Sequence, residues 1–80
     1  MRLDKFLKVS RILKRRTLAA EACDMGKVTV NRRPSKSGHK LKVGDVVEIE
    51  FVGSTLKFRV LSLNEKARKE EASSLYEIVE

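Results

Sequence analysis

The chain has 80 residues, with 18 Lys or Arg and 11 Asp or Glu, so its formal net charge is +7. This length allows one domain with one small core, and a single cysteine excludes an internal disulfide and favours a reducing compartment. Residues 1–40 hold 12 basic and 3 acidic side chains, whereas residues 41–80 hold 6 and 8. A surplus confined to one half predicts a surface that faces a polyanion. No apolar run reaches the roughly 20 residues of a membrane span, so we expect a cytoplasmic protein.

The first expected element is an amphipathic helix within residues 2–13. Its apolar positions repeat at helical spacing and are Leu3, Phe6 and Leu7. Its basic positions form a stripe on the opposite side and are Arg2, Lys5 and Lys8. Asp4 has two readings that the sequence leaves open: it stabilises the helix start through the dipole, or it orients Arg2 or Arg16.

A cationic segment at residues 11–16 leads into a second short helix, expected over residues 18–25. Thr17 is the expected N-cap, and Gly26 is expected in the left-handed conformation that ends many helices. The apolar residues of this helix are Leu18, Ala19, Ala22, Cys23 and Met25. We expect Cys23 to be a buried small hydrophobe.

Arg16 would then lie at the mouth of the second helix, where free N–H groups attract phosphate. Its guanidinium adds a bidentate donor that a lysine lacks. The alternative is that Arg16 pairs with Glu21 or Asp24 of the same helix.

The rest of the first 63 residues predicts a small antiparallel sheet. A strand at residues 27–30 turns at Asn31-Arg32, and Pro34 makes the return strand short or an edge strand. Residues 35–40 form a polar loop that contains His39. Strands at 46–51 and 55–61 form a second hairpin. The residues expected to face the core are Val28, Val30, Val47, Ile49, Phe51, Leu56, Phe58 and Val60.

Residues 64–80 are expected to be a charged, loosely structured tail, because residues 64–74 lack an apolar stripe. Residues 75–79 either dock as a late strand or stay mobile.

The sequence contains none of the common enzyme motifs. It lacks a Gly-rich phosphate loop, a CxxC pair, a His/Cys cluster and a serine-nucleophile motif. Its three Phe are expected in the core, which leaves no aromatic platform for single-stranded bases. We therefore expect a non-catalytic module without cofactor, metal or small-molecule substrate, which recognises the backbone of folded RNA.

Four motifs identify a family resemblance over about residues 1–50. They are RLDKFL at 2–7, RTLA at 16–19, GKVTVN at 26–31 and KVGDV at 42–46, and they resemble the S4 RNA-binding domain in order and spacing. The resemblance implies an α+β fold of the αL-like S4 type, two short helices packed on a small antiparallel β-sheet, with residues 1–63 as the S4-type RNA-binding domain. Arg15 and Arg32 depart from the Ser and Gly that many relatives have there.

Stand-alone members that begin in the same way are similar to ribosome-associated heat-shock-type and ribosome quality-control proteins. The resemblance implies a protein that binds stalled large ribosomal subunits through 23S rRNA and peptidyl-tRNA, and we expect it to be a monomer. It would hold the P-site tRNA while an RqcH-type alanine-tailing factor extends the nascent chain. The alternatives are a generic ribosome- or tRNA-binding heat-shock-type factor that recycles blocked subunits, and a basic protein-binding or membrane-surface module.

The expected RNA-binding surface combines the basic stripe, the cationic segment and the first hairpin. Its residues are Arg2, Lys5, Lys8, Arg11, Lys14, Arg15, Arg16, Lys27, Asn31, Arg32, Arg33 and Lys36. If about five phosphates are contacted, the logarithm of the binding constant should fall with the logarithm of salt with a slope of about −3.5 to −4.5.

Overall fold

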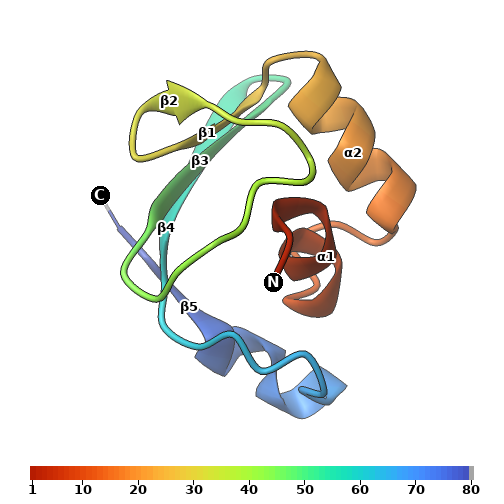
Figure 1. Ribbon diagram of the computed structural model, residues 1–80, viewed down its shortest axis with the longest axis vertical. Coiled ribbons are helices and arrows are strands. Elements are labelled where there is room, and N and C mark those ends of the chain that lie inside the picture. Colours follow the sequence, from red (N-terminus) through yellow and green to blue (C-terminus); the bar gives the residue numbers. More distant parts are fainter. Residues whose placement is uncertain (80) are drawn as a thin grey trace.

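Two α-helices cover one face of an antiparallel sheet in the computed structural model, which describes residues 1–79 (Figure 1). The elements in chain order are α1 (Leu3–Val9), α2 (Arg16–Asp24), β1 (Val28–Val30), β2 (Arg33–Pro34), β3 (Val46–Phe51), β4 (Ser54–Val60), the 3₁₀-helix η1 (Lys69–Leu75) and β5 (Tyr76–Ile78). Within these residues the sheet has five strands in the order β2-β1-β3-β4-β5. The predicted α+β fold is therefore confirmed.

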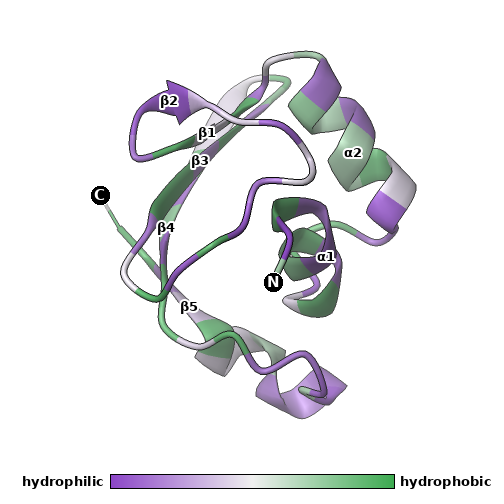
Figure 2. Cartoon of the chain, in the orientation of Figure 1, coloured by the Kyte–Doolittle hydropathy of each residue, from purple (hydrophilic) through white to green (hydrophobic). Residues whose placement is uncertain are grey.

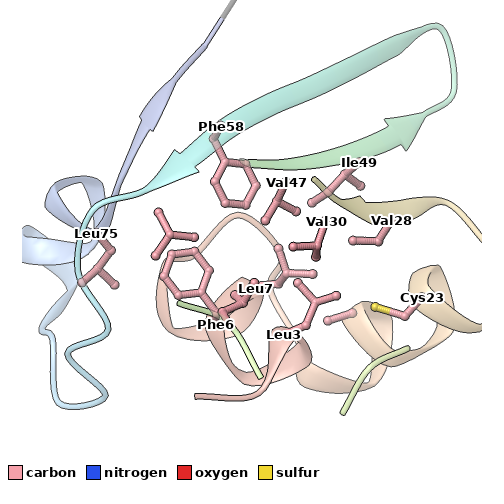
Figure 3. Packing of buried hydrophobic residues seen from close by; sticks show 13 residues of the cluster. Leu3, Phe6, Leu7, Cys23, Val28, Val30, Val47, Ile49, Phe58 and Leu75 are labelled. Atoms are coloured by element: carbon pink, nitrogen blue, oxygen red, sulfur yellow. The ribbon is translucent and has the colours of Figure 1, made fainter. Parts of the chain in front are cut away.

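The core lies between the two helices and the sheet, as Figure 3 shows. Phe6 of α1 and Phe58 of β4 are both fully buried, with ring centroids 6.0 Å apart. Tyr76 of β5 meets Phe58 edge-on at 5.3 Å. Burial of a side chain as large as Phe contributes roughly 1.5–3 kcal/mol. These rings therefore stabilise the packing of α1 against β4 and of β4 against β5.

The first helix is shorter than its periodicity predicts. It ends at Val9, because Arg11 adopts a left-handed conformation with φ +61°. The N–H of Leu13 then donates to the carbonyl of Leu7 at 3.0 Å. This turn reverses the chain, so Ile12 and Leu13 pack at the edge of the core instead of extending α1.

The second helix begins earlier than expected, and the prediction of Thr17 as its N-cap is wrong. Arg15 occupies the N-cap position and makes no side-chain cap bond there. Of its apolar residues, Ala19 and Cys23 are buried, as predicted for Cys23, whereas Leu18 and Met25 are 43% and 67% exposed. The predicted left-handed Gly26 is confirmed, with φ +72°.

The first hairpin has the predicted turn. Asn31 and Arg32 have φ +52° and +69°, as the favoured two-residue hairpin turn requires. Pro34 lies in the two-residue edge strand β2, as expected. The predicted burial of Phe51 is wrong, since it is 40% exposed. It is the last residue of β3 and pairs with Ser54, next to the hairpin turn.

The segment after residue 63 has more structure than expected. Its 3₁₀-helix η1 buries Ala72 and Leu75, and β5 pairs antiparallel with β4. The carbonyl of Leu75 accepts hydrogen bonds from the N–H groups of Leu61 and Ser62 at 2.8 and 3.2 Å. A spacing of three residues is the period of a 3₁₀-helix, which a search for a 3.6-residue stripe does not detect. No helix in residues 1–79 has the length and apolar character of a membrane span.

Candidate nucleic-acid interface

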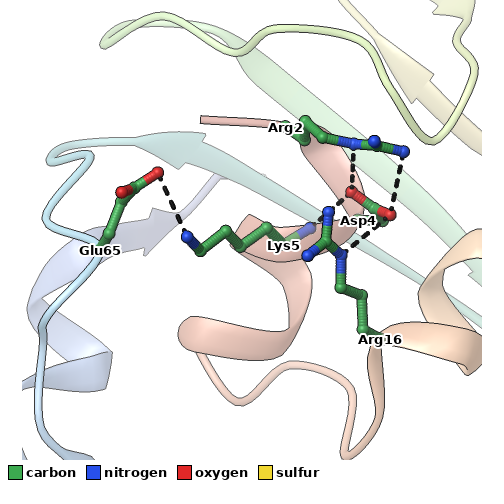
Figure 4. A network of polar contacts seen from close by, with 5 residues as sticks. All are labelled: Arg2, Asp4, Lys5, Arg16 and Glu65. Carbon is green, nitrogen blue, oxygen red and sulfur yellow. Dashed lines mark hydrogen bonds and ion pairs between the residues drawn. The ribbon is translucent and has the colours of Figure 1, made fainter.

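One buried carboxylate holds two arginines at the start of α1 (Figure 4). The side chain of Asp4 is 6% exposed. Arg2 Nε donates to its Oδ1 at 3.2 Å, and Arg16 Nε donates to its Oδ2 at 3.1 Å. The backbone N–H of Lys5 donates to the same Oδ1 at 2.8 Å. The expectation that Asp4 orients these arginines is therefore confirmed for both. We call Arg2, Asp4 and Arg16 the Asp4 cluster.

Arg16 thus pairs across the two helices, and the predicted alternative pairing with Glu21 or Asp24 is wrong. Its ion pair joins α2 to a residue twelve positions earlier in α1. Because Arg16 is the first residue of α2, its guanidinium lies at the start of that helix, as expected.

The ionisation of Asp4 follows from its neighbours. Burial by itself raises the pKa of Asp4, but the hydrogen bonds from Arg16 and from the Lys5 N–H, and the charges of Arg16 and Arg2, together outweigh burial. The pKa of Asp4 therefore lies below its ordinary value, and the carboxylate is ionised at neutral pH. Two cations share one anion, so the Asp4 cluster keeps a net positive charge.

The two guanidinium groups remain accessible while they are held. The side chains of Arg2 and Arg16 are 52% and 48% exposed. Arg16 uses only Nε toward Asp4, which leaves both terminal nitrogens as donors. Guanidinium donors of this kind bind phosphate oxygens in bidentate geometry, so the Asp4 cluster presents pre-oriented phosphate donors at the surface.

The loop from residue 35 to residue 45 fixes the start of α1 through its backbone. The N–H of Leu3 donates to the carbonyl of His39 at 2.8 Å, and the N–H of Asp4 donates to that of Ser37 at 3.1 Å. Arg2 also forms an isolated antiparallel bridge with Lys40. The position of the Asp4 cluster is therefore set by a segment more than thirty residues away.

Asn31 has a structural role in the fold. Its Nδ2 donates to Asp45 Oδ1 at 3.1 Å, and its Oδ1 accepts from the N–H of Val46 at 3.0 Å. Both ends of the amide therefore tie the first hairpin to the turn before β3. In the structure the Asn31 side chain therefore makes hydrogen bonds within the protein, whereas the sequence predicts that it contacts RNA.

The other expected RNA-binding residues lie at separate places in the structure. Lys5 Nζ pairs with Glu65 at 3.5 Å, which links α1 to the segment before η1. Lys27 and Arg32 lie at opposite ends of β1. The remaining cations, which have no acidic partner within residues 1–79, are Lys8, Arg11, Lys14, Arg15, Arg33 and Lys36.

Two cations that the sequence reading did not select, Lys40 and Lys42, line an open groove together with Arg33. The sequence feature that could have identified them is the close spacing of Lys36, Lys40 and Lys42 in one polar stretch.

Cys23 is buried, and burial followed by the charges of Asp4 and Asp24 raises the pKa of its thiol to about 11, in line with a structural role. Residues 1–79 contain no cluster of His, Cys, Asp and Glu able to hold a metal ion.

Comparison with known proteins places this geometry among RNA-binding modules. The family described as S4 domain matches residues 1–47. The RQC P-site tRNA stabilizing factor of Halalkalibacterium halodurans is 51% identical over 78 residues, which cover 98% of this chain and 89% of that protein. The protein of the same name from Streptococcus pneumoniae is 51% identical over 79 residues, 99% of this chain and 90% of that protein. The trimeric structure of Vibrio cholerae heat shock protein 15 superposes with a TM-score of 0.91 at 26% identity, covering 99% of this chain and 81% of that one.

Proposed function

The chain belongs to the S4 domain family and to its group of RQC P-site tRNA stabilizing factors, and from this premise we propose that it is a non-catalytic RNA-binding factor of ribosome quality control. It binds stalled large ribosomal subunits and stabilises the tRNA in their P site. The similarity supports this proposal because it extends over nearly the whole length of both chains.

The single observation that carries the proposal is the Asp4 cluster. Arg2 and Arg16 are half-exposed and share one buried carboxylate, and Arg16 keeps both terminal guanidinium nitrogens free of it. Because Asp4 holds them before any ligand arrives, little side-chain entropy is lost when phosphate binds. Such fixed donors suit a factor that holds an RNA in place and performs no chemistry on it.

The finer part of the proposal concerns the partners. The protein acts as a monomer in the cytoplasm and contacts both 23S rRNA and the peptidyl-tRNA. It keeps the tRNA in position while an RqcH-type factor directs alanine tailing of the nascent chain. The excess of cations over acidic partners on the N-terminal half supports contact with more than one RNA segment.

A second candidate is a general heat-shock-type factor that binds and recycles blocked large subunits without a part in tailing. The superposition on Vibrio cholerae heat shock protein 15 favours it. The two candidates share the fold and the cations, so they differ only in what is purified with the protein. Alanine-tailed chains and an RqcH-type factor belong to the first candidate alone.

The deciding experiment is sucrose-gradient sedimentation of the tagged protein from its own cells, with the bound RNA sequenced. We expect migration with large subunits that carry peptidyl-tRNA, together with the tailing factor. The variant Arg2→Gln/Arg16→Gln should move to the top of the gradient. The control variant Arg59→Gln changes a cation of β4 that is already paired with Glu77, and it should stay with the subunits. A wild-type protein that migrates at the top with no ribosomal or transfer RNA contradicts the proposal.

A further inference from the structure

We infer that the open groove between the first hairpin and the loop of residues 35–45 is a second binding site for RNA backbone, separate from the Asp4 cluster. This inference rests on the proposed function and adds to it a second phosphate contact. The groove encloses about 560 Å³, within the range of sites that hold small ligands. We call it the loop groove.

The charges of the loop groove favour a polyanion. Arg33, Lys40 and Lys42 line it, and none of the three has an acidic partner within residues 1–79. Figure 2 shows the hydrophilic character of β2 and of parts of the loop that follows it. Asp45 is the acidic residue of the lining, so the three cations leave a positive balance.

Asp45 is already engaged by the fold. Its Oδ1 accepts from Asn31 Nδ2 at 3.1 Å, and its Oδ2 accepts from the backbone N–H of Lys42 at 2.9 Å. Both oxygens are thus occupied by neutral donors, and the carboxylate organises the turn rather than neutralising a lysine side chain. The cations therefore remain free to contact a ligand.

The remaining lining points to the ribose-phosphate backbone. Apart from His39, the lining residues, all within residues 1–79, include no aromatic ring on which a base could stack. Val30, Pro34 and Ser35 also line the groove and add a small, partly apolar surface to it. Phosphate oxygens would therefore meet the cations and the histidine, while bases would point outward.

The loop groove and the Asp4 cluster are mechanically connected. His39 and Lys40 line the groove, and the same residues bond through their backbone to Leu3 and Arg2. One ordered loop therefore holds both sites at a fixed separation. Two fixed sites on one small domain add their phosphate contacts within a single binding event.

The test is a charge-neutral groove variant, Arg33→Gln/Lys40→Gln/Lys42→Gln. Its matched control is Lys66→Gln/Arg68→Gln/Lys69→Gln, which makes the same chemical change on exposed residues before and at the start of η1. Affinities are measured over a salt series for free tRNA and for purified large subunits with and without P-site tRNA. The hydrogen bonds of Lys42 and the bridge of Lys40 use backbone atoms, so the groove variant should fold.

The groove variant should lower the magnitude of the logarithmic salt slope by about 2 and raise the Kd at 0.15 M salt by about 40-fold. The control variant should keep the wild-type slope. A loss on free tRNA assigns the groove to tRNA, and a loss only on subunits assigns it to ribosomal RNA; both outcomes support the inference. Single variants Lys40→Gln and Lys42→Gln should each lower the slope by about 0.7 to 0.9.

An unchanged slope in a folded groove variant overturns the second site and leaves the proposed function intact. Wild-type protein that binds neither tRNA nor subunits removes the proposed function instead. The two failures are therefore distinguishable, because the first compares variants and the second concerns the wild type alone.

Discussion

The Asp4 cluster and the outer face of the sheet contain the same kinds of charged side chain in opposite arrangements. On the outer face, Arg59 Nη1 meets Glu77 at 2.7 Å and Lys57 Nζ meets Glu48 at 3.7 Å. Each cation there has its own anion, and all four side chains are about one-third to one-half exposed. In the Asp4 cluster two arginines share one buried anion.

This difference decides what each surface can do. Exposed one-to-one pairs cancel their charge locally and contribute little to stability. A buried carboxylate that serves two arginines orients them and leaves a positive surplus. The count of lysines and arginines therefore overstates the RNA-binding surface, since part of that count is paired on the outer face.

The largest change should follow from Asp4→Ala. It removes the acceptor of Arg2, of Arg16 and of the Lys5 N–H, so the free energy of unfolding should fall by about 1.5 to 3 kcal/mol. Urea denaturation measures this, and Asp4→Asn, which keeps one oxygen acceptor, should lose less. If both variants are as stable as the wild type, the Asp4 cluster does not contribute to the fold.

Arg16→Ala should affect binding more than folding. Affinity for the ribosome should fall by about 1–3 kcal/mol, because a guanidinium contact to phosphate is lost. The domain should stay folded, since Asp4 keeps Arg2 and the Lys5 N–H. Arg16→Lys restores the charge without the fork, so only partial recovery is expected. Unchanged affinity in a filter-binding assay removes Arg16 from the interface.

Acid should weaken the Asp4 cluster selectively. The pKa of Asp4 is lower in the folded protein than its ordinary value of 3.8, so the unfolded chain binds more protons in this range. The stabilising contribution is complete above the unfolded pKa and is lost as the pH falls through the folded pKa. Unfolding free energies of the wild type and of Asp4→Asn should therefore converge in acid, and parallel curves would argue against this.

A smaller change in the free energy of unfolding is expected from substitution of Arg32, in the turn of the first hairpin next to the outer face of the sheet. Arg32 lines a groove there with Lys57 and Arg59, and its φ of +69° is unfavourable for a residue with a Cβ. Arg32→Gly should raise the free energy of unfolding by about 0.5–1 kcal/mol, because relief of that strain exceeds the entropy cost of glycine. Arg32→Ala removes the same charge and keeps the strain, so it should show no such gain.

The smallest effect should come from Glu77→Gln on the outer face. Loss of its exposed pair with Arg59 should lower the free energy of unfolding by about 0.2–1 kcal/mol. The difference should disappear at high salt, since exposed charges are screened. Thermal unfolding at low and high salt tests both statements, and a loss as large as that of Asp4→Ala would remove the contrast between the two regions.

Alternation and helical spacing located most of the core correctly. Leu3, Phe6 and Leu7 are fully buried, as are Val47 and Phe58. The error concerns a residue at the end of an element. Phe51 has the right periodicity, but it is the last residue of β3, next to the hairpin turn, and is 40% exposed. A pattern identifies which face is apolar, whereas burial depends on the length of the partner.

The candidate site was predictable in its composition and only partly in its geometry. The first helix and the cationic segment supplied Arg2 and Arg16, and Asp4 was recognised as a possible partner for either. That Asp4 binds both depends on the left-handed turn at Arg11, which sets α2 beside α1. Lys40 and Lys42 were missed because their shared groove with Arg33 exists only after the loop packs on α1.

The sequence by itself determined the excess of positive charge on the N-terminal half, the alternation of the strands, the Asn31-Arg32 turn and the membership of the S4 domain family. These properties depend on residues close together in the chain. Only the tertiary structure decided which cations are paired, which are held by Asp4 and which line the loop groove. Charge pairing depends on distances of a few ångströms between distant segments, and those distances are set by how the helices end and how the loop packs.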